Sequence, residues 1–145
     1  MTHKEPTVNP ETIQRVRQSW AQLTPIAPQA AGLFYANLFA ADPTLRPLFR
    51  SDLTAQGHKL ILMLDAAVNG LDDLEALVPP LQALARRHSG YGVLPAHYAT
   101  VGAALLLTLE QGLGPAFTQP VRASWTEVYG RVADVMIAAG QPSAA

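Results

Sequence analysis

The sequence contains no cysteine among its 145 residues. Without thiols the chain cannot form disulfides, a Cys-ligated zinc site, an iron–sulfur cluster or a haem attached through thioether bonds. It also lacks an apolar run of the ~20 residues that span a bilayer, and its polar first residues do not resemble a signal peptide. The charges are balanced, with 10 Lys and Arg against 11 Asp and Glu, so no basic surface suggests nucleic acid. We therefore expect one cytoplasmic domain with no nucleic-acid or membrane partner.

An alternation of apolar and polar residues, the usual mark of a strand, is also missing. Apolar residues recur instead at three- and four-residue steps, which places them on one face of a helix. We expect an all-α domain of six or seven helices at residues 9–140, with a flexible N-terminal tail at 1–8 and a C-terminal tail at 141–145. The helices are expected from Pro10 onward, at about 28–41, 54–71 and 79–88, from Pro95 onward, and at about 118–139.

Proline and capping residues suggest where two of these helices begin. Asn9-Pro10 is typical of an N-cap followed by the first helical residue, since proline lacks the N–H that a first turn leaves unpaired. By the same reasoning, Pro79-Pro80 is predicted to open the helix that ends at His88. Ser89-Gly90 then follows as a stop signal.

His88 is the most informative single residue. Leu77, Leu81 and Leu84 recur at helical steps, and one further step of four residues reaches His88. The imidazole therefore points the same way as the buried face, where a polar ring needs a partner. A metal ion is one candidate partner, and a protein group that satisfies an ordinary core histidine is the other.

Three groups of residues, in the same order along the chain, resemble the globin family. The likeness is greatest to bacterial single-domain globins, including those of thermophiles, and to the haem domain of flavohaemoglobins, and it covers roughly residues 10–139. The residues that carry it are Leu33–Phe39 with Pro43 and Arg46–Phe49; Arg86–Val93 with His97, Tyr98, Val101 and Gly102; and Trp125, Glu127–Gly130 and Ala133–Val135.

The resemblance implies a globin fold whose helices sandwich one haem b, held without covalent bonds, and it implies that His88 is the iron ligand. Neutral imidazole suits iron, and a single protein ligand leaves the sixth coordination position open. Phe49 matches the phenylalanine that packs flat on the haem, where an aromatic ring covers a large apolar area. Ordinary core packing is the alternative for Phe49.

Tyr35 and Gln56 match the two polar positions on the opposite, distal side of the haem, and Leu60 lies one helical turn after Gln56. The resemblance implies that Leu60 narrows the pocket over the iron. The Tyr35 hydroxyl and the Gln56 amide are donors for the partial negative charge that dioxygen acquires on ferrous iron. The alternatives are a core tyrosine bonded to a backbone carbonyl and a glutamine on a solvated helix face.

The remaining expected haem contacts are cationic or apolar. Lys59 and Arg87 could pair with the haem propionates, or could be plain solvated cations. His58 is two residues after Gln56, about 200° around a helix, and is expected to point away from the haem; His97 is expected at the surface. Contacts on the side of His88 are expected from Leu84, Val93, Tyr98 and Val101, which core packing alone would also explain.

The chain departs from the flavohaemoglobin pattern at one place. In that family the tyrosine that matches Tyr98 joins a glutamate of the last helix, and together they make the proximal histidine more imidazolate-like. Here Gly140 stands where the glutamate is expected, and no acidic residue follows Asp134. We therefore expect a proximal ligand suited to holding dioxygen rather than to splitting peroxide.

These residues fit more than one function. We expect reversible, high-affinity binding of dioxygen, and of other diatomic gases such as CO and NO, by a monomer or homodimer. A nitric oxide dioxygenase is the enzymatic alternative, and it would need an external reductase because the chain carries no flavin or nicotinamide motif. A gas sensor and a haemless interaction module are further alternatives. The sequence leaves open whether the protein is an enzyme.

Overall fold

The computed structural model describes residues 8–49, 52–90 and 95–140, with the backbone alone at residues 89 and 90. Within these ranges the chain forms six α-helices, four short 3-10 helices and no strand, which confirms the all-α prediction. The α-helices are α1 (Pro10–Leu23), α2 (Ala27–Ala41), α3 (Leu53–Asn69), α4 (Leu74–Gly90), α5 (Pro95–Leu113) and α6 (Gln119–Gly140). The 3-10 helices are η1 (Thr24–Ile26), η2 (Pro43–Leu48), η3 (Leu71–Asp73) and η4 (Gly114–Ala116).

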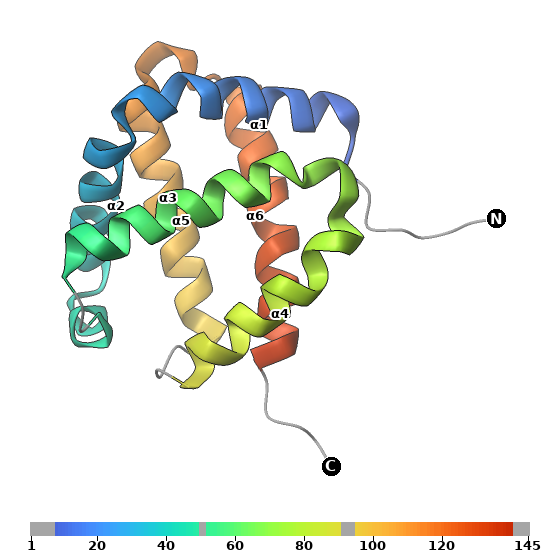
Figure 1. The fold of residues 1–145 in the computed structure, drawn as a ribbon. Coiled ribbons are helices and arrows are strands. Elements are labelled where there is room, and N and C mark those ends of the chain that lie inside the picture. Colours follow the sequence, from blue (N-terminus) through green and yellow to red (C-terminus); the bar gives the residue numbers. More distant parts are fainter. Residues whose placement is uncertain (1–7, 50–51, 91–94, 141–145) are drawn as a thin grey trace.

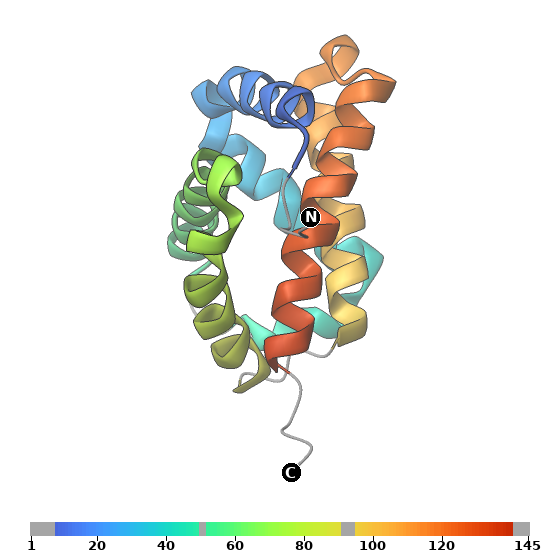
Figure 2. The same cartoon turned by 90° about the vertical axis from the view of Figure 1, so that its right-hand side faces the viewer.

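The helices form two layers that α1 joins at one end (Figures 1 and 2). α3 and α4 make one layer, α5 and α6 lie side by side in the other, and α1 crosses the end of both. α2 packs on α5 and α3, whereas α4 packs mainly on α6. The helix that carries His88 extends to Gly90, through the predicted stop at Ser89-Gly90, and is held in the fold chiefly through one neighbour.

Two helix starts follow from local side-chain hydrogen bonds. Asn9 Oδ1 accepts the Glu11 N–H at 2.7 Å, and Pro10 is the first residue of α1. This arrangement confirms the predicted N-cap, which satisfies a backbone donor that the first turn leaves unpaired. At the corner after α2, the Asp42 carboxylate accepts the Thr44 N–H at 3.0 Å and opens η2.

The start of α4 differs from the prediction. The helix begins at Leu74, and Pro79 and Pro80 lie inside it rather than at its first turn. Asp73 provides the start, because its carboxylate accepts the Ala76 N–H at 3.3 Å. Proline in a helix interior removes a hydrogen bond and crowds the carbonyl four residues earlier. Here both prolines are exposed, so solvent can hydrate the carbonyls that they leave unpaired.

The buried side chains form two clusters. The larger cluster joins α1, α2, α3, α5 and α6. The smaller cluster joins α4, α6 and the start of α5, and its buried centre is Leu81, Ala85 and Met136. Val8, which the sequence places in the N-terminal tail, is 6% exposed and belongs to the larger cluster. Val8 therefore packs with the helices, although the sequence assigns it to the tail.

Candidate functional site

His88 lies in the last turn of α4 and is partly buried. Burial lowers the pKa of its imidazole, the neighbouring Arg87 lowers it further, and a hydrogen bond to the backbone of Leu84 acts in the opposite direction. The ring is therefore neutral at physiological pH, which is the form that binds a metal ion. Because the Leu84 carbonyl occupies one ring nitrogen, the other nitrogen is left to meet a ligand.

The residues expected around His88 are divided between the two clusters. Leu84 and Tyr98 pack against the smaller cluster, on the side of the core that α4 provides. Val101, expected on the same side, packs against the larger cluster. Val93 lies outside the described residues. Two of the four expected contacts, Leu84 and Tyr98, therefore pack in the same cluster as α4, the helix that carries His88.

Tyr129 holds the first turns of α5 against α6. Its hydroxyl donates to the Tyr98 carbonyl at 2.6 Å, and its ring lies on Gly102, where an added Cβ would meet Cε2 at 2.7 Å. Glycine leaves room for this close approach. Burial, and then the nearby Tyr98, raise the pKa of the Tyr129 hydroxyl, so it remains a donor at neutral pH. The backbone that carries Tyr98 is thus fixed from α6.

Tyr35, in α2, is only 6% exposed. Burial raises the pKa of Tyr35 to about 12, because a buried site disfavours the charged phenolate. Burial is the cause of this shift, and no hydrogen bond from another described residue contributes to it. The Tyr35 hydroxyl is therefore a protonated donor at neutral pH.

Two phenylalanines hold the Tyr35 ring, and we call these three residues the aromatic cluster. Tyr35 stacks on Phe39 with centroids 6.0 Å apart and meets Phe49 edge-on at 5.4 Å. Phe39 and Phe49 also meet edge-on, at 5.4 Å, which is a geometry that aromatic pairs prefer. The Arg46 guanidinium lies 5.5 Å over the Phe39 ring and donates to the Phe49 carbonyl at 3.1 Å. Arg46 therefore fixes the cluster from outside.

α3 brings Gln56 and Leu60 to the aromatic cluster. α2 and α3 approach closely at Gly57, where an added Cβ would lie 3.0 Å from the Ala31 Cβ and 3.9 Å from Cε2 of Tyr35. Gln56, the neighbour of Gly57, is partly buried. Leu60, one turn later, is also partly buried and packs against the larger cluster. Gln56 and Leu60, the two expected distal residues of α3, therefore lie within one helix turn of the point where α3 approaches Tyr35.

The expected charged and polar partners at the edge of the site differ in burial. Lys59 and Arg87 are exposed, and neither has an ion pair with another described residue. His58 is exposed, which agrees with the expectation that it points away from the core. His97, expected at the surface, is partly buried at the start of α5, near Asp42.

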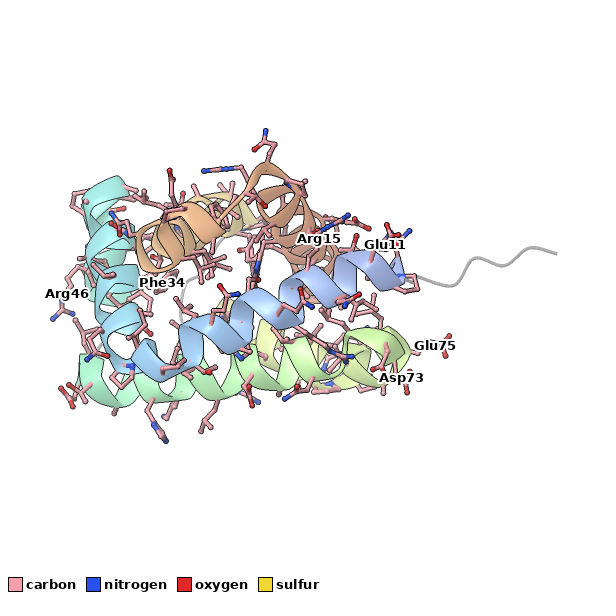
Figure 3. All side chains as sticks on the ribbon, turned by 90° about the horizontal axis from the view of Figure 1, so that it is seen from above. Glu11, Arg15, Phe34, Arg46, Asp73 and Glu75 are labelled. Atoms are coloured by element: carbon pink, nitrogen blue, oxygen red, sulfur yellow. The ribbon has the colours of Figure 1, made fainter. Side chains whose placement is uncertain are left out.

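Carboxylates are scarce on the α4–α6 side of the site. α6 ends at Gly140, and its last acidic residue, Asp134, is exposed. Asp73 and Glu75 lie at the end of the molecule opposite Arg46 (Figure 3). Within the described part of α6, no carboxylate follows Asp134.

Three supporting residues received no role from the sequence, namely Phe39, Arg46 and Tyr129. Phe39 and Arg46 stand in the motifs that resemble globins, but a motif does not say which rings stack or which carbonyl is bound. The hydrogen bond between Tyr129 and Tyr98 joins residues 31 positions apart, so no local signal could have found it. The Leu84 carbonyl could have been found, because a residue four positions before His88 lies on the same helix face.

The arrangement of these residues fits a haem. Of the expected haem contacts, Tyr35 belongs to the larger cluster and Phe49 and Leu60 pack against it, whereas Leu84 and Tyr98 pack against the smaller one. A flat macrocycle needs apolar side chains on both of its faces, and the two clusters supply them. From the α4 side, His88 offers a neutral imidazole with a ring nitrogen to spare, which is a ligand that iron prefers.

Comparisons with known proteins give the same family. A sequence model described as Globin matches residues 32–136. The chain is 33% identical over 135 residues to a neuroglobin of Danio rerio, which covers 83% of this chain and 85% of that protein. It is 30% identical over 130 residues to a flavohemoprotein of Vibrio cholerae, which covers 88% of this chain but only 33% of that longer protein. The chain belongs to the globin family.

Solved structures share the fold. One is an engineered carbene transferase, described as a putative nitric oxide dioxygenase from Rhodothermus marinus; it has a TM-score of 0.83 at 28% identity and covers 92% of this chain and 94% of its own. A bacterial globin from Campylobacter jejuni has a TM-score of 0.80 at 24% identity, covers 91% of this chain and 96% of its own, and supports the fold alone. As a globin, the chain is a haem protein that binds diatomic gases. None of the helices within the described ranges is both long and apolar enough to cross a bilayer.

Proposed function

We propose that the protein binds dioxygen reversibly and with high affinity in the cytoplasm, through a non-covalent haem b whose iron is held by His88. The observation that carries the proposal is Tyr35, whose side chain is buried and whose hydroxyl is protonated at neutral pH. When bound, the haem supplies an iron that takes dioxygen and passes partial negative charge to it. The chain's own residues then decide how long the ligand stays.

Tyr35 supplies the main donor toward that charge. A hydrogen bond to a charged acceptor is stronger than one between neutral groups, and the buried surroundings of Tyr35 strengthen it further. The aromatic cluster and Arg46 hold the ring in place, so the donor needs little rearrangement when the ligand arrives.

Gln56 and Leu60 complete the distal side. The Gln56 amide is a second donor, and the Leu60 side chain limits the space above the iron and excludes water. Phe49 covers the haem face beside Tyr35. On the opposite side, burial keeps the His88 ring neutral and the hydrogen bond to the Leu84 backbone orients it, while Tyr98 and Val101 add apolar contacts. Lys59 and Arg87, both exposed, are candidates for the propionates.

A nitric oxide dioxygenase is the second candidate function. Two similar proteins favour it, namely the flavohemoprotein and the structure described as a putative nitric oxide dioxygenase. In this reaction nitric oxide is oxidised to nitrate by dioxygen, and the ferric haem must then be reduced. This chain corresponds to 33% of the flavohemoprotein, and the candidate function includes an external reductase as the source of the electron. Sustained nitric oxide consumption with added reductase and nicotinamide cofactor would favour this candidate over simple binding.

The rate of dioxygen release from Tyr35→Phe tests the main proposal. Phenylalanine keeps the ring packing and removes only the hydroxyl. Loss of a hydrogen bond to a charged group costs about 1.5–3 kcal/mol, so release should become roughly ten- to a hundredfold faster. Stopped-flow displacement of dioxygen by excess CO measures this rate.

The release of CO from the same variant serves as the matched control. CO is less polar than bound dioxygen and gains less from a donor, so its release should change by a much smaller factor. An unchanged dioxygen off-rate would overturn the role of Tyr35. Equal acceleration of both ligands would show that the substitution altered the pocket as a whole rather than one hydrogen bond.

A further inference from the structure

The guanidinium of Arg17, on α1, closes the end of α3. Its Nε donates to the Val68 carbonyl at 3.2 Å, and its Nη2 donates to the Asn69 carbonyl at 2.7 Å and to the Asp72 carboxylate at 3.3 Å. The last carbonyls of a helix have no partner within it and carry the negative end of its dipole, so a cation there satisfies both needs. The last turn of α3 has no basic residue of its own. Arg17 therefore supplies from α1 what α3 lacks.

These bonds lie at the corner between α3 and α4, which we define as residues 68–73. The corner contains η3, and its two apolar side chains, Val68 and Leu71, are each 2% exposed and belong to the larger cluster. Arg17 is partly exposed and Asn69 is exposed. The corner is thus fixed on its inner side by apolar packing and on its solvent side by one arginine.

The two helices that carry the expected haem residues meet at this corner. α3 carries Gln56 and Leu60, and α4, which lies in the same layer, carries His88 in its last turn (Figure 1). His88 is 14 residues after Leu74, the first residue of α4, which is about 21 Å along a helix. A tilt of α4 by about 5° at the corner would therefore move the imidazole by about 2 Å.

α4 has few other anchors. It packs mainly on α6, and Pro79 and Pro80 interrupt its backbone hydrogen bonds. Its first turn is capped by Asp73, whose carboxylate accepts the Ala76 N–H at 3.3 Å, and Asp73 directly follows the residue to which Arg17 donates. Arg17 therefore acts on both helices, because it satisfies the last carbonyls of α3 and holds the segment from which α4 starts.

We propose that Arg17 is a positioning residue that sets how long the haem stays in the protein, an inference that rests on the proposed haem function. With Arg17 in place, the corner holds α3 and α4 so that the two clusters cover the macrocycle and His88 stays within reach of the iron. Without it, α4 tilts away more often and water reaches His88. Arg17 does not touch the gas ligand, so the dioxygen off-rate depends on Tyr35 and not on Arg17.

Transfer of haem from the ferric protein to an excess of apomyoglobin, followed at the Soret band, tests the proposal. Arg17→Met keeps most of the side-chain stem and removes the charge and every donor. Haem release should then become roughly three- to tenfold faster, because charged hydrogen bonds are lost at a partly exposed corner. Arg17→Lys keeps the charge but not the forked donors, so its release rate should lie between those of the parent and Arg17→Met.

Arg15→Met is the matched control, because Arg15 lies on the same helix but has its partners elsewhere. Arg15 pairs with Glu11 at 3.9 Å and donates to the Ser124 hydroxyl of α6 at 3.4 Å. Its substitution removes an equally long cation from α1 without touching the corner. Haem release from Arg15→Met should therefore equal that of the parent.

Two further measurements separate positioning from a general loss of stability. In haem-loaded Arg17→Met the dioxygen off-rate should stay at the parent value, and hydrogen exchange should increase at residues 68–90 while α2 and α5 keep their protection. Unchanged haem release in both Arg17 variants, equal acceleration in Arg15→Met, or an exchange increase spread over all helices would overturn the proposal. These results with an intact Soret band in the parent contradict this inference alone, whereas absence of that band contradicts the proposed function.

Discussion

The hydroxyl of Tyr129 donates a hydrogen bond of 2.6 Å to the carbonyl of Tyr98 and so ties α6 to the first turns of α5. The contact depends on Gly102, because an added Cβ there would lie 2.7 Å from the Tyr129 ring. We therefore predict that Gly102→Ala forces the ring aside and lowers the free energy of unfolding by about 1–3 kcal/mol. Urea unfolding followed by circular dichroism measures the change.

Gly130→Ala is the matched control for this substitution. Gly130 also lies in a helix, but an added Cβ would meet nothing within 4 Å. Alanine should stabilise the helix there by up to about 1 kcal/mol. Equal effects of the two substitutions would contradict the close packing of Tyr129 on Gly102.

Alkaline unfolding should report the burial of Tyr35. Its pKa of about 12 lies above the ordinary value of 10.0, so the folded chain holds this proton more tightly than the unfolded chain does. The stability that this provides is complete below pH ~10 and is lost as the pH rises through ~12. The free energy of unfolding should therefore fall less steeply over this range in Tyr35→Phe. Parallel pH profiles of parent and variant would contradict the prediction.

Removal of the haem should loosen α4 before the other helices. α4 packs mainly on α6, through a cluster with three buried members, and carries two prolines inside the helix. Regions with few buried contacts open at low free-energy cost, and a ligand that binds the folded state suppresses such opening. Hydrogen exchange of haem-free against haem-loaded protein should show the largest increase at residues 74–90. A uniform increase over all helices would contradict this account.

Helix positions could be predicted where the signal is local. Asn9 and Pro10 mark the start of α1 correctly because a capping hydrogen bond involves neighbours in sequence. The predicted start of α4 at Pro79-Pro80 is wrong, because the capping bond is made earlier in the chain by the carboxylate of Asp73. A proline favours a first turn, but it is also tolerated on an exposed helix face where water replaces the lost bond.

The candidate site could be predicted only as a set of residues, not as a set of contacts. Periodicity places His88 on the buried face of its helix, but it does not say what that face meets. The edge-on contact between Tyr35 and Phe49 depends on how η2 folds back on α2. The bond from Trp20 to Asp65 joins residues 45 positions apart. Such pairs are decided by tertiary packing, which a single sequence does not display.

The absorption spectrum of the purified, haem-loaded protein tests the central claim most directly, because that claim is a haem iron held by His88 with an open sixth position. We predict a Soret band, a five-coordinate ferrous spectrum under nitrogen, and a reversible change to a six-coordinate spectrum on adding dioxygen. His88→Ala should lose the stable haem complex. Absence of a Soret band after haem addition, or a six-coordinate ferrous spectrum without added ligand, would contradict the account.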